Sequence, residues 1–323
     1  MPLFRKRAPR QLRRIFLASD LHGSTRCFEK FLRALEFYEA DVLMIAGDLT
    51  GKMIIPIVEE DSGRWTSSFQ GREQEIDGDE LLAHEEVIES AGLYAYRTTR
   101  DEIADLSEHP SRVDEIFHRL VRERVERWVE MAEERLAAAD RYCYFVAGND
   151  DYPDIDPILE QGERFRFVDG RRAVVVDQFE VIGLGFSNVT PWNAPRDVPE
   201  EEIAARLAAL TASIEKPESA IYLIHVPPAG STLDLAPELD ADLRPIGAGD
   251  NKIHAGSTAV AACIEETQPM LSLHGHIHES RGIYKIGRTV SLNPGSEYGE
   301  GILRGAIVNV EPGKFASHLF VSG

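Results

Sequence analysis

The sequence is short of cysteine, of positive charge and of long apolar runs, and each shortage excludes a class of protein. Its three cysteines, Cys27, Cys143 and Cys263, are odd in number and widely spaced, so we expect reduced core thiols in a cytoplasmic protein. No apolar run approaches the roughly 18 residues that a membrane span needs. The basic stretch between Arg5 and Arg14 is followed by an apolar segment too short for a signal peptide, so we do not expect secretion.

Positive charge is scarce relative to negative charge. Lys and Arg together number 35 and Asp and Glu 55, which gives a formal net charge of −20. This balance argues against nucleic acid and anionic membranes as partners, because both attract basic surfaces. A hydrophobic fraction of 43% and a charged fraction of 28% over 323 residues are typical of an ordinary globular protein.

Five short apolar runs along the chain each end in polar side chains. Such runs are typical of buried strands, and a segment with helical spacing between the first two runs predicts a β-α-β unit. Open α/β sheets usually carry their chemistry at the carboxyl ends of their strands. The polar residues at the five ends are Asp20 with His22, Asp48, Asn149, His225, and His276 with His278.

The last of these runs is followed by three histidines at alternate positions. Because strand side chains alternate between faces, we expect His276 and His278 to point to one side, with Gly275 allowing close backbone approach. His274 is expected to pack or hydrogen-bond nearby. A single histidine here is more often an ordinary core or surface residue, whereas two adjacent imidazoles favour a metal.

The chemistry of the seven candidate ligands narrows the choice of metal. Imidazole and carboxylate groups with one amide oxygen suit Mn, Fe, Zn, Co or Ni, whereas calcium prefers oxygen throughout. Seven ligands are too many for one ion. Two ions that share a bridging carboxylate would use all seven.

The segment from 52 to 140 differs in character from the rest of the chain. A hairpin is expected between Ile54 and Phe69, followed by helices, the last of them long and starting with a capping box at Ser111 and Asp114. Its apolar stripe favours packing against the core. We therefore expect a largely helical insertion, acting as a lid or as a dimerisation arm that forms a homodimer.

These motifs together resemble the calcineurin-like metallophosphoesterase family, in particular its predicted prokaryotic phosphoesterases. The resemblance follows the family's order of motifs, covers the chain outside the insertion and implies a single domain over residues 1–323. The implied fold is α/β, an αββα sandwich of two mixed β-sheets flanked by helices. The matching pieces are D-x-H at Asp20–His22, G-D at Gly47–Asp48, G-N at Gly148–Asn149, the lone His225 and G-H-x-H at Gly275–His278.

The resemblance also implies the roles of the ligands and the reaction. The cofactors would be two divalent transition-metal ions, Mn first, with Fe, Zn, Ni or Co as alternatives. A hydroxide shared by the ions would attack a small phosphoester substrate. Asp20, His22 and His278 would hold one ion, Asn149, His225 and His276 the other, and Asp48 would bridge them.

One position departs from the family's pattern. The family commonly has a histidine after the asparagine, whereas this chain has Asp150. A carboxylate beside two dications stays ionised, is a poor acid and repels a dianionic monoester more than a monoanionic diester. We therefore expect a phosphodiesterase, with Asp150 as one candidate catalytic residue. His254 is the other, because it lies just before Gly256–Ser257 and could approach the site. In the alternative interpretation Asp150 is a loop residue that faces away from the site. Independently of this choice, we expect Asp151 to orient the loop or a ligand histidine.

Two other functions stay open at this level. The missing histidine and the insertion would also fit a catalytically weak scaffold or protein-interaction module that keeps the metallophosphoesterase fold. A DNA nuclease is a third interpretation, but the acidic balance and the absence of a basic, aromatic-interleaved track argue against it.

Overall fold

The computed structural model describes residues 12–60, 63–176 and 179–323. Most of the basic stretch that begins at Arg5, and the turn residues Asp61 and Ser62 of the expected hairpin, lie outside the described residues. All three cysteines are free, as expected. No helix in the described ranges has the length and apolarity to cross a membrane.

The first of two large sheets contains the first three of the predicted strands. Its order is β20-β19-β1-β2-β7-β8, with β1, β2, β7 and β8 parallel to one another and β19 antiparallel to β1. The run that precedes each set of candidate ligands is buried because it lies in the middle of this sheet. The strands are β1 (Arg13–Ala18), β2 (Val42–Ala46), β7 (Tyr142–Val146), β8 (Phe165–Phe167), β19 (Arg304–Glu311) and β20 (Lys314–Ser322).

The second large sheet contains the remaining two predicted strands, β13 and β16, at its centre. Its order is β17-β18-β16-β13-β10-β9, and it is mixed as well. Leu17 and Met44 of the first sheet share one buried apolar cluster with Leu223 and Leu271 of the second, so the sheets pack face to face. The strands are β9 (Arg172–Val175), β10 (Phe179–Leu184), β13 (Ile221–Ile224), β16 (Leu271–Leu273), β17 (Gly282–Ile286) and β18 (Thr289–Asn293).

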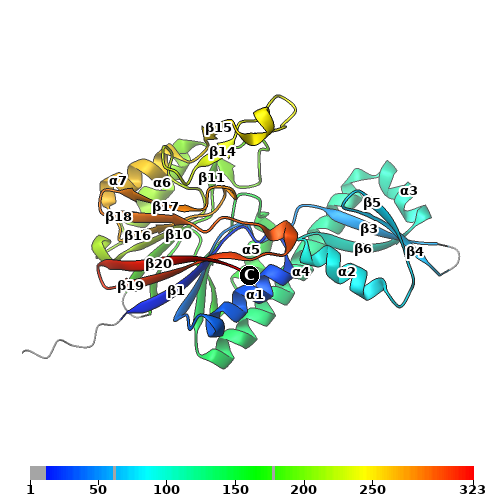
Figure 1. Ribbon diagram of the computed structural model, residues 1–323, viewed down its shortest axis with the longest axis horizontal. Helices are drawn as coiled ribbons and strands as arrows, with labels where there is room; N and C mark the ends of the chain where they lie inside the picture. Colours follow the sequence, from blue (N-terminus) through cyan, green and yellow to red (C-terminus); the bar gives the residue numbers. More distant parts are fainter. Residues whose placement is uncertain (1–11, 61–62, 177–178) are drawn as a thin grey trace, which may run out of the picture.

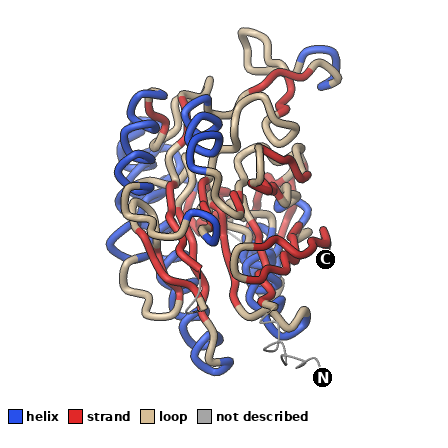
Figure 2. Tube along the Cα trace, turned by 90° about the vertical axis from the view of Figure 1, so that its left-hand side faces the viewer, coloured by secondary structure: helices blue, strands red, loops and turns tan. Residues whose placement is uncertain are grey.

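Helices cover the outer faces of both sheets (Figures 1 and 2). On the first sheet, Phe28 of α1 stacks on Trp128 of α4 with ring centroids 4.1 Å apart, and both share a buried cluster with Phe145 of β7. On the second sheet, α6 and α7 pack over β10 and β13. The predicted αββα sandwich of two mixed sheets is confirmed. The helices are α1 (Thr25–Phe37), α4 (Pro110–Ala139), α5 (Asp156–Leu159), α6 (Glu200–Thr211) and α7 (Thr258–Thr267).

A third, four-stranded sheet stands to one side of the sandwich (Figure 1). The hairpin expected after Ile54 is confirmed as β3 and β4, but the sheet continues into β5 and β6, which the sequence had not predicted. The residues of β5 are mostly exposed, so its sequence lacks the alternation that reveals a strand. Its elements are β3 (Ile54–Glu59), β4 (Trp65–Phe69), β5 (Arg72–Ile76), α2 (Leu81–Ser90), β6 (Tyr94–Thr99) and α3 (Arg100–Glu108).

Helix α4 joins this sheet to the sandwich and begins at Pro110, and it differs from the prediction only in how its first turn is capped. The capping box expected at Ser111 is wrong, because Pro110 occupies the first turn and the N-cap falls on His109. The apolar stripe is buried from Val121 onward and faces the core, as expected. The remaining short strands pair as β11 (Ser187–Asn188) with β12 (Asp197–Val198) and β14 (Leu235–Pro237) with β15 (Lys252–His254).

Candidate metal centre

The loops that follow β1, β2 and β16 hold strained backbone. Asp20, His22, Asp48 and His276 have φ angles of 54°, 40°, 52° and 69°, a region that residues with a Cβ adopt rarely. Each such residue costs on the order of 1–3 kcal/mol, and clusters of them mark functional sites. Four of the seven candidate ligands are therefore held in conformations that the surrounding fold has to impose.

One group of candidate ligands lies around Asp48, which follows strand β2 of the first sheet. Ligand atoms of Asp20, His22, Asp48 and His278 all lie within 4.8 Å of one another. His22 Nε2 lies 3.0 Å from His278 Nε2 and 3.4 Å from Asp48 Oδ2, and His278 Nε2 lies 3.5 Å from Asp20 Oδ1. Three of the four are fully or almost fully buried. This group could hold a metal ion.

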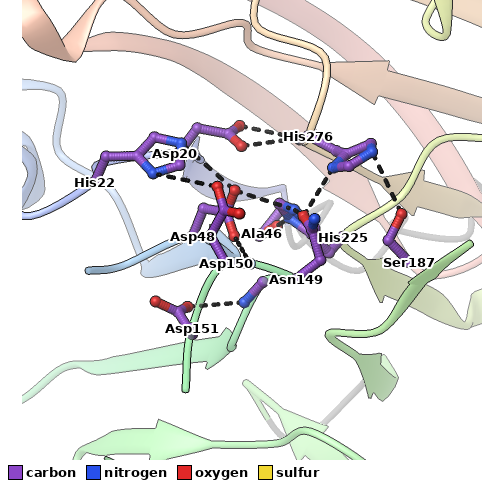
Figure 3. Close-up of polar contacts among 12 residues, drawn as sticks. Asp20, His22, Ala46, Asp48, Asn149, Asp150, Asp151, Ser187, His225 and His276 are labelled. Carbon is purple, nitrogen blue, oxygen red and sulfur yellow. Dashed lines mark hydrogen bonds and ion pairs between the residues drawn. The ribbon is translucent and has the colours of Figure 1, made fainter. Parts of the chain in front are cut away.

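A second group lies on the other side of Asp48 (Figure 3). Asn149 Oδ1 lies 3.0 Å from His225 Nε2 and 2.9 Å from His276 Nδ1. His225 Nε2 is also 3.5 Å from Asp48 Oδ2. The same carboxylate oxygen of Asp48 therefore faces an imidazole of each group. The structure brings all seven candidate ligands together.

Hydrogen bonds fix the orientation of these side chains. His225 Nδ1 donates to the carbonyl of Ala46 at 2.6 Å, which turns Nε2 toward Asp48 and Asn149. The amide nitrogen of Asn149 donates to Asp197 at 3.1 Å, which turns its oxygen toward the histidines. Partners of this kind orient metal ligands in many proteins.

Asp151 fastens two of the ligand loops to each other. Its buried carboxylate accepts hydrogen bonds from the backbone N–H groups of Leu49, Thr50 and Gly148 at 2.8–3.1 Å. Two of these donors directly follow Asp48 on one loop, and the third directly precedes Asn149 on the other. The expectation that Asp151 orients the loop is confirmed.

The glycines of the motifs are required by close packing. A Cβ at Gly148 would lie 2.0 Å from Asp48 Oδ1, and one at Gly275 would lie 1.7 Å from Ser19 Oγ. Both distances are far below van der Waals contact. Glycine at these positions lets the ligand loops approach one another without a side chain between them.

The histidine cluster converges by a different route from the one predicted. Strand β16 ends at Leu273, so His276 and His278 lie in the following loop and the alternation of strand faces does not apply to them. Asn293 holds this loop, because its Nδ2 donates to the carbonyls of Gly275 and Ile277 at 3.0 Å. His274 is buried and bonded to the carbonyl of Ile224, as expected.

The imidazoles of the candidate ligands divide into two kinds by their pKa values. Burial opposes charge on His225, but Asp48 and then Asp20 raise its pKa to about 10, so a cation bound beside Asp48 has to displace a proton from this ring. Burial lowers the pKa of His22 and of His276 to about 3, so these rings keep free lone pairs. Only one proton fits between the facing Nε2 atoms of His22 and His278. The donor set, with carboxylates between imidazoles, fits divalent transition metals.

The two candidate catalytic residues lie in different surroundings. Asp150 lies beside the first group, with Oδ2 3.9 Å from His22 Nδ1 and its backbone N–H donating to Asp48 Oδ1 at 3.1 Å. His254 lies on β15 with a half-exposed ring, and its Nδ1 is 2.8 Å from the buried Asp234. Within the described ranges no hydrogen bond or ion pair joins His254 to the seven candidate ligands.

Sequence reasoning missed two residues at this site. Lys52 forms an ion pair with Asp150, and the ring centroid of Tyr298 lies 4.6 Å from that of His22. Neither belongs to a recognisable motif. The position of Lys52, four residues after Asp48 and before the insertion, was the one available signal, since residues that closely follow a ligand loop tend to stay near it.

Comparison with known proteins gives one relative by sequence and several structures by fold. No family model matches the sequence. A solved crystal structure superimposes with a TM-score of 0.55 at 17% identity, covering 97% of this chain and 98% of that chain. The crystal structure of TT1561 of Thermus thermophilus superimposes with a TM-score of 0.52 at 15% identity and the same coverage. At these identities the likeness shows the fold alone.

The sequence relative is the uncharacterized protein MJ1162 of Methanocaldococcus jannaschii. It is 31% identical over 166 residues, which cover 50% of this chain and 68% of that protein. An identity of this size over two thirds of the relative exceeds what a shared fold alone produces. The chain therefore belongs to the family of the uncharacterized protein MJ1162.

Proposed function

We propose that the protein is a metal-dependent phosphoesterase that binds two divalent cations and cleaves small phosphodiesters. The observation that carries the proposal is the position of Asp48 between two groups of ligands, with Oδ2 3.4 Å from His22 Nε2 and 3.5 Å from His225 Nε2. A carboxylate facing two ligand sets is the arrangement that a bridging ligand requires.

The proposed assignment divides the remaining six ligands between two sites. We take Mn²⁺ as the first choice for both ions. Fe, Zn, Ni and Co are alternatives, because mixed nitrogen and oxygen donors accept each of these metals. When bound, such a pair of cations lowers the pKa of a water and neutralises phosphoryl oxygens. Asp20, His22 and His278 would hold one cation, and Asn149, His225 and His276 the other.

The preference for diesters rests on the charges beside the first group. The repulsion expected from Asp150 is reduced, because Lys52 pairs with its carboxylate. The pair is net neutral, so it offers no extra positive charge to balance the second negative charge of a phosphomonoester. A monoanionic diester needs no such balance.

Metal analysis combined with two chromogenic substrates tests the proposal. We expect about two Mn²⁺ per chain and faster turnover of bis-p-nitrophenyl phosphate than of p-nitrophenyl phosphate. Asp48→Asn should lose metal and activity together, because the neutral amide cannot serve two cations. A clear preference for the monoester would overturn the proposal that the protein cleaves phosphodiesters. A wild-type protein that binds no metal and hydrolyses neither substrate would favour the scaffold.

His254 is a candidate proton donor to the leaving group. The buried carboxylate of Asp234 fixes the ring, and the backbone N–H of Gly230 donates to the same carboxylate at 2.9 Å. The next residue, Ala255, accepts a hydrogen bond from Asn188, whose neighbour Ser187 is bonded to His276. His254→Gln should slow the hydrolysis of alkyl phosphodiesters more than that of p-nitrophenyl phosphodiesters, because an alkoxide leaving group needs the proton and p-nitrophenolate does not. An equal loss of rate for both kinds of ester would show that His254 does not protonate the leaving group.

A further inference from the structure

Lys52 is a cationic side chain beside the candidate metal centre that no ligand role explains. Its ammonium pairs with Asp150 Oδ2, and that oxygen lies 3.9 Å from His22 Nδ1. The Lys52 side chain is 52% exposed and that of Asp150 21% exposed, so the pair lies at the mouth of the centre and not beneath it. An ion pair in this position is open to an incoming anion.

The fold fixes both partners of the pair from the backbone. The N–H of Gly51 donates to the hydroxyl of Tyr94 at 3.0 Å, and the N–H of Asp150 donates to Asp48 at 3.1 Å. A Cβ at Gly51 would lie 2.0 Å from the carbonyl oxygen of Gly92. The backbone before Lys52 is therefore held against the third sheet, and its side chain starts from a fixed point.

The charge of Lys52 is secured by its neighbours. Burial lowers the pKa of Lys52, but Asp150 and Asp48 outweigh burial and raise the pKa above its ordinary value. A lysine ammonium is a compact point charge with three donors, which suits a phosphoryl oxygen. Arg281, a second cation near the histidine loop, is instead bonded to Ser322 and the carbonyl of Val321.

We propose that Lys52 binds a phosphoryl oxygen of the substrate, and that Asp150 is a positioning residue that holds the ammonium and offsets its charge. Asp150 stands where the family's pattern has a histidine, and Lys52 lies against it. The proposal rests on the phosphoesterase function proposed above and names the residue that recognises the substrate. It also makes the Lys52–Asp150 pair the determinant of the choice between diesters and monoesters.

Binding of inorganic phosphate to the manganese-loaded protein tests the role of Lys52. Lys52→Met and Lys52→Gln should each weaken phosphate binding by about 10- to 100-fold, the worth of a hydrogen bond to a charged group. Lys52→Arg should retain most of the affinity. The matched control is Lys285→Met, an exposed lysine on the edge strand β17. Titration calorimetry gives the phosphate affinity and the manganese stoichiometry of each protein.

The outcomes separate this proposal from the proposed function. Unchanged phosphate affinity in the folded, manganese-loaded Lys52 variants would overturn the proposal and leave the phosphoesterase intact. A wild-type protein that binds no phosphate would also overturn it. Loss of manganese together with phosphate would assign Lys52 to the metal site and would likewise contradict the proposal.

Asp150→Asn tests the positioning role through substrate choice. Removing the carboxylate releases the full charge of Lys52, so the ratio of kcat/KM for p-nitrophenyl phosphate to that for bis-p-nitrophenyl phosphate should rise by about tenfold. The double variant with Lys52→Met should return the ratio to its original value. A purely structural Asp150 would lower both activities together, and an unchanged ratio refutes the positioning role.

Discussion

The sandwich and the four-stranded sheet beside it are stabilised in different ways. Strands at the centre of the sandwich, such as β2 and β13, are buried at every residue. In the smaller sheet β5 is exposed at four of its five residues, and the apolar cluster contains only six buried side chains. Ion pairs such as Arg97–Glu85 and Arg100–Glu60 lie on its surface. The ligand loops with strained backbone follow strands of the sandwich, which has the larger apolar core.

The smaller sheet reaches the candidate metal centre through contacts between backbones. A Cβ at Gly92 would lie 2.2 Å from the carbonyl oxygen of His22, and one at Gly23 would lie 2.8 Å from the carbonyl oxygen of Gly92. The buried Arg124 of α4 donates to the carbonyls of Gly23 and Leu93 across this contact. A weakly packed region is thus docked firmly at one point.

Gly92→Ala should have the largest effect, because it breaks this docking. The new Cβ meets the His22 carbonyl and forces a φ of +85° on alanine, and we expect a loss of about 3–5 kcal/mol together with weaker metal binding. Gly71→Ala is the matched control, since Gly71 has a φ of +73° with nothing within 4 Å. Denaturant unfolding and manganese titration compare the two. Equal effects would mean that the contact is unimportant.

Deleting one aromatic ring from each region should show how unequal their cores are. Phe28→Ala removes a fully buried ring of the sandwich and should lower the global free energy of unfolding by about 3–5 kcal/mol. Phe69→Ala acts on the small cluster of the other sheet, so it should open that sheet locally and leave manganese binding intact. Hydrogen exchange distinguishes local from global opening. One cooperative loss of protection in both variants would contradict the contrast.

Acid should destabilise the sandwich through His274. Burial lowers the pKa of this ring to about 4, so between pH 6.5 and 4 the unfolded state binds more protons than the folded state. The resulting penalty is absent above pH 6.5 and reaches about 3 kcal/mol below pH 4. Urea unfolding of metal-free protein measures it. In His274→Gln the dependence on pH should be shallower, and an identical slope would show that other groups dominate.

The smallest effect is expected at the surface of the four-stranded sheet. Arg97 makes two bonds to Glu85, at 2.6 and 2.7 Å, but its side chain is 46% exposed. Arg97→Ala should cost less than about 1 kcal/mol, and the cost should shrink in high salt. Unfolding at two salt concentrations provides the measurement. A cost of several kcal/mol would show that ion pairs hold this sheet more strongly than we infer.

The sequence predicted the centre of the fold better than its periphery. Buried strands that end in ligands are visible in a sequence, because an apolar run and the polar residue after it are adjacent in the chain. Strand β5 was missed because its exposed polar residues have no alternation. The Lys52–Asp150 pair joins residues far apart in the chain, and no local pattern encodes such a contact. The turn to His276 was misread since β16 ends three residues earlier.

The close contact of Gly23, Gly51 and Gly92 has a consequence for how the protein can change by mutation. Where backbones touch, no alternative side chain is tolerated, so these positions should resist substitution in a selection for new substrates. Lys52 follows the contact directly but has a side chain that is half open to solvent. Variation in substrate choice should therefore accumulate at Lys52 and its partner, while the spacing between the two regions stays constant.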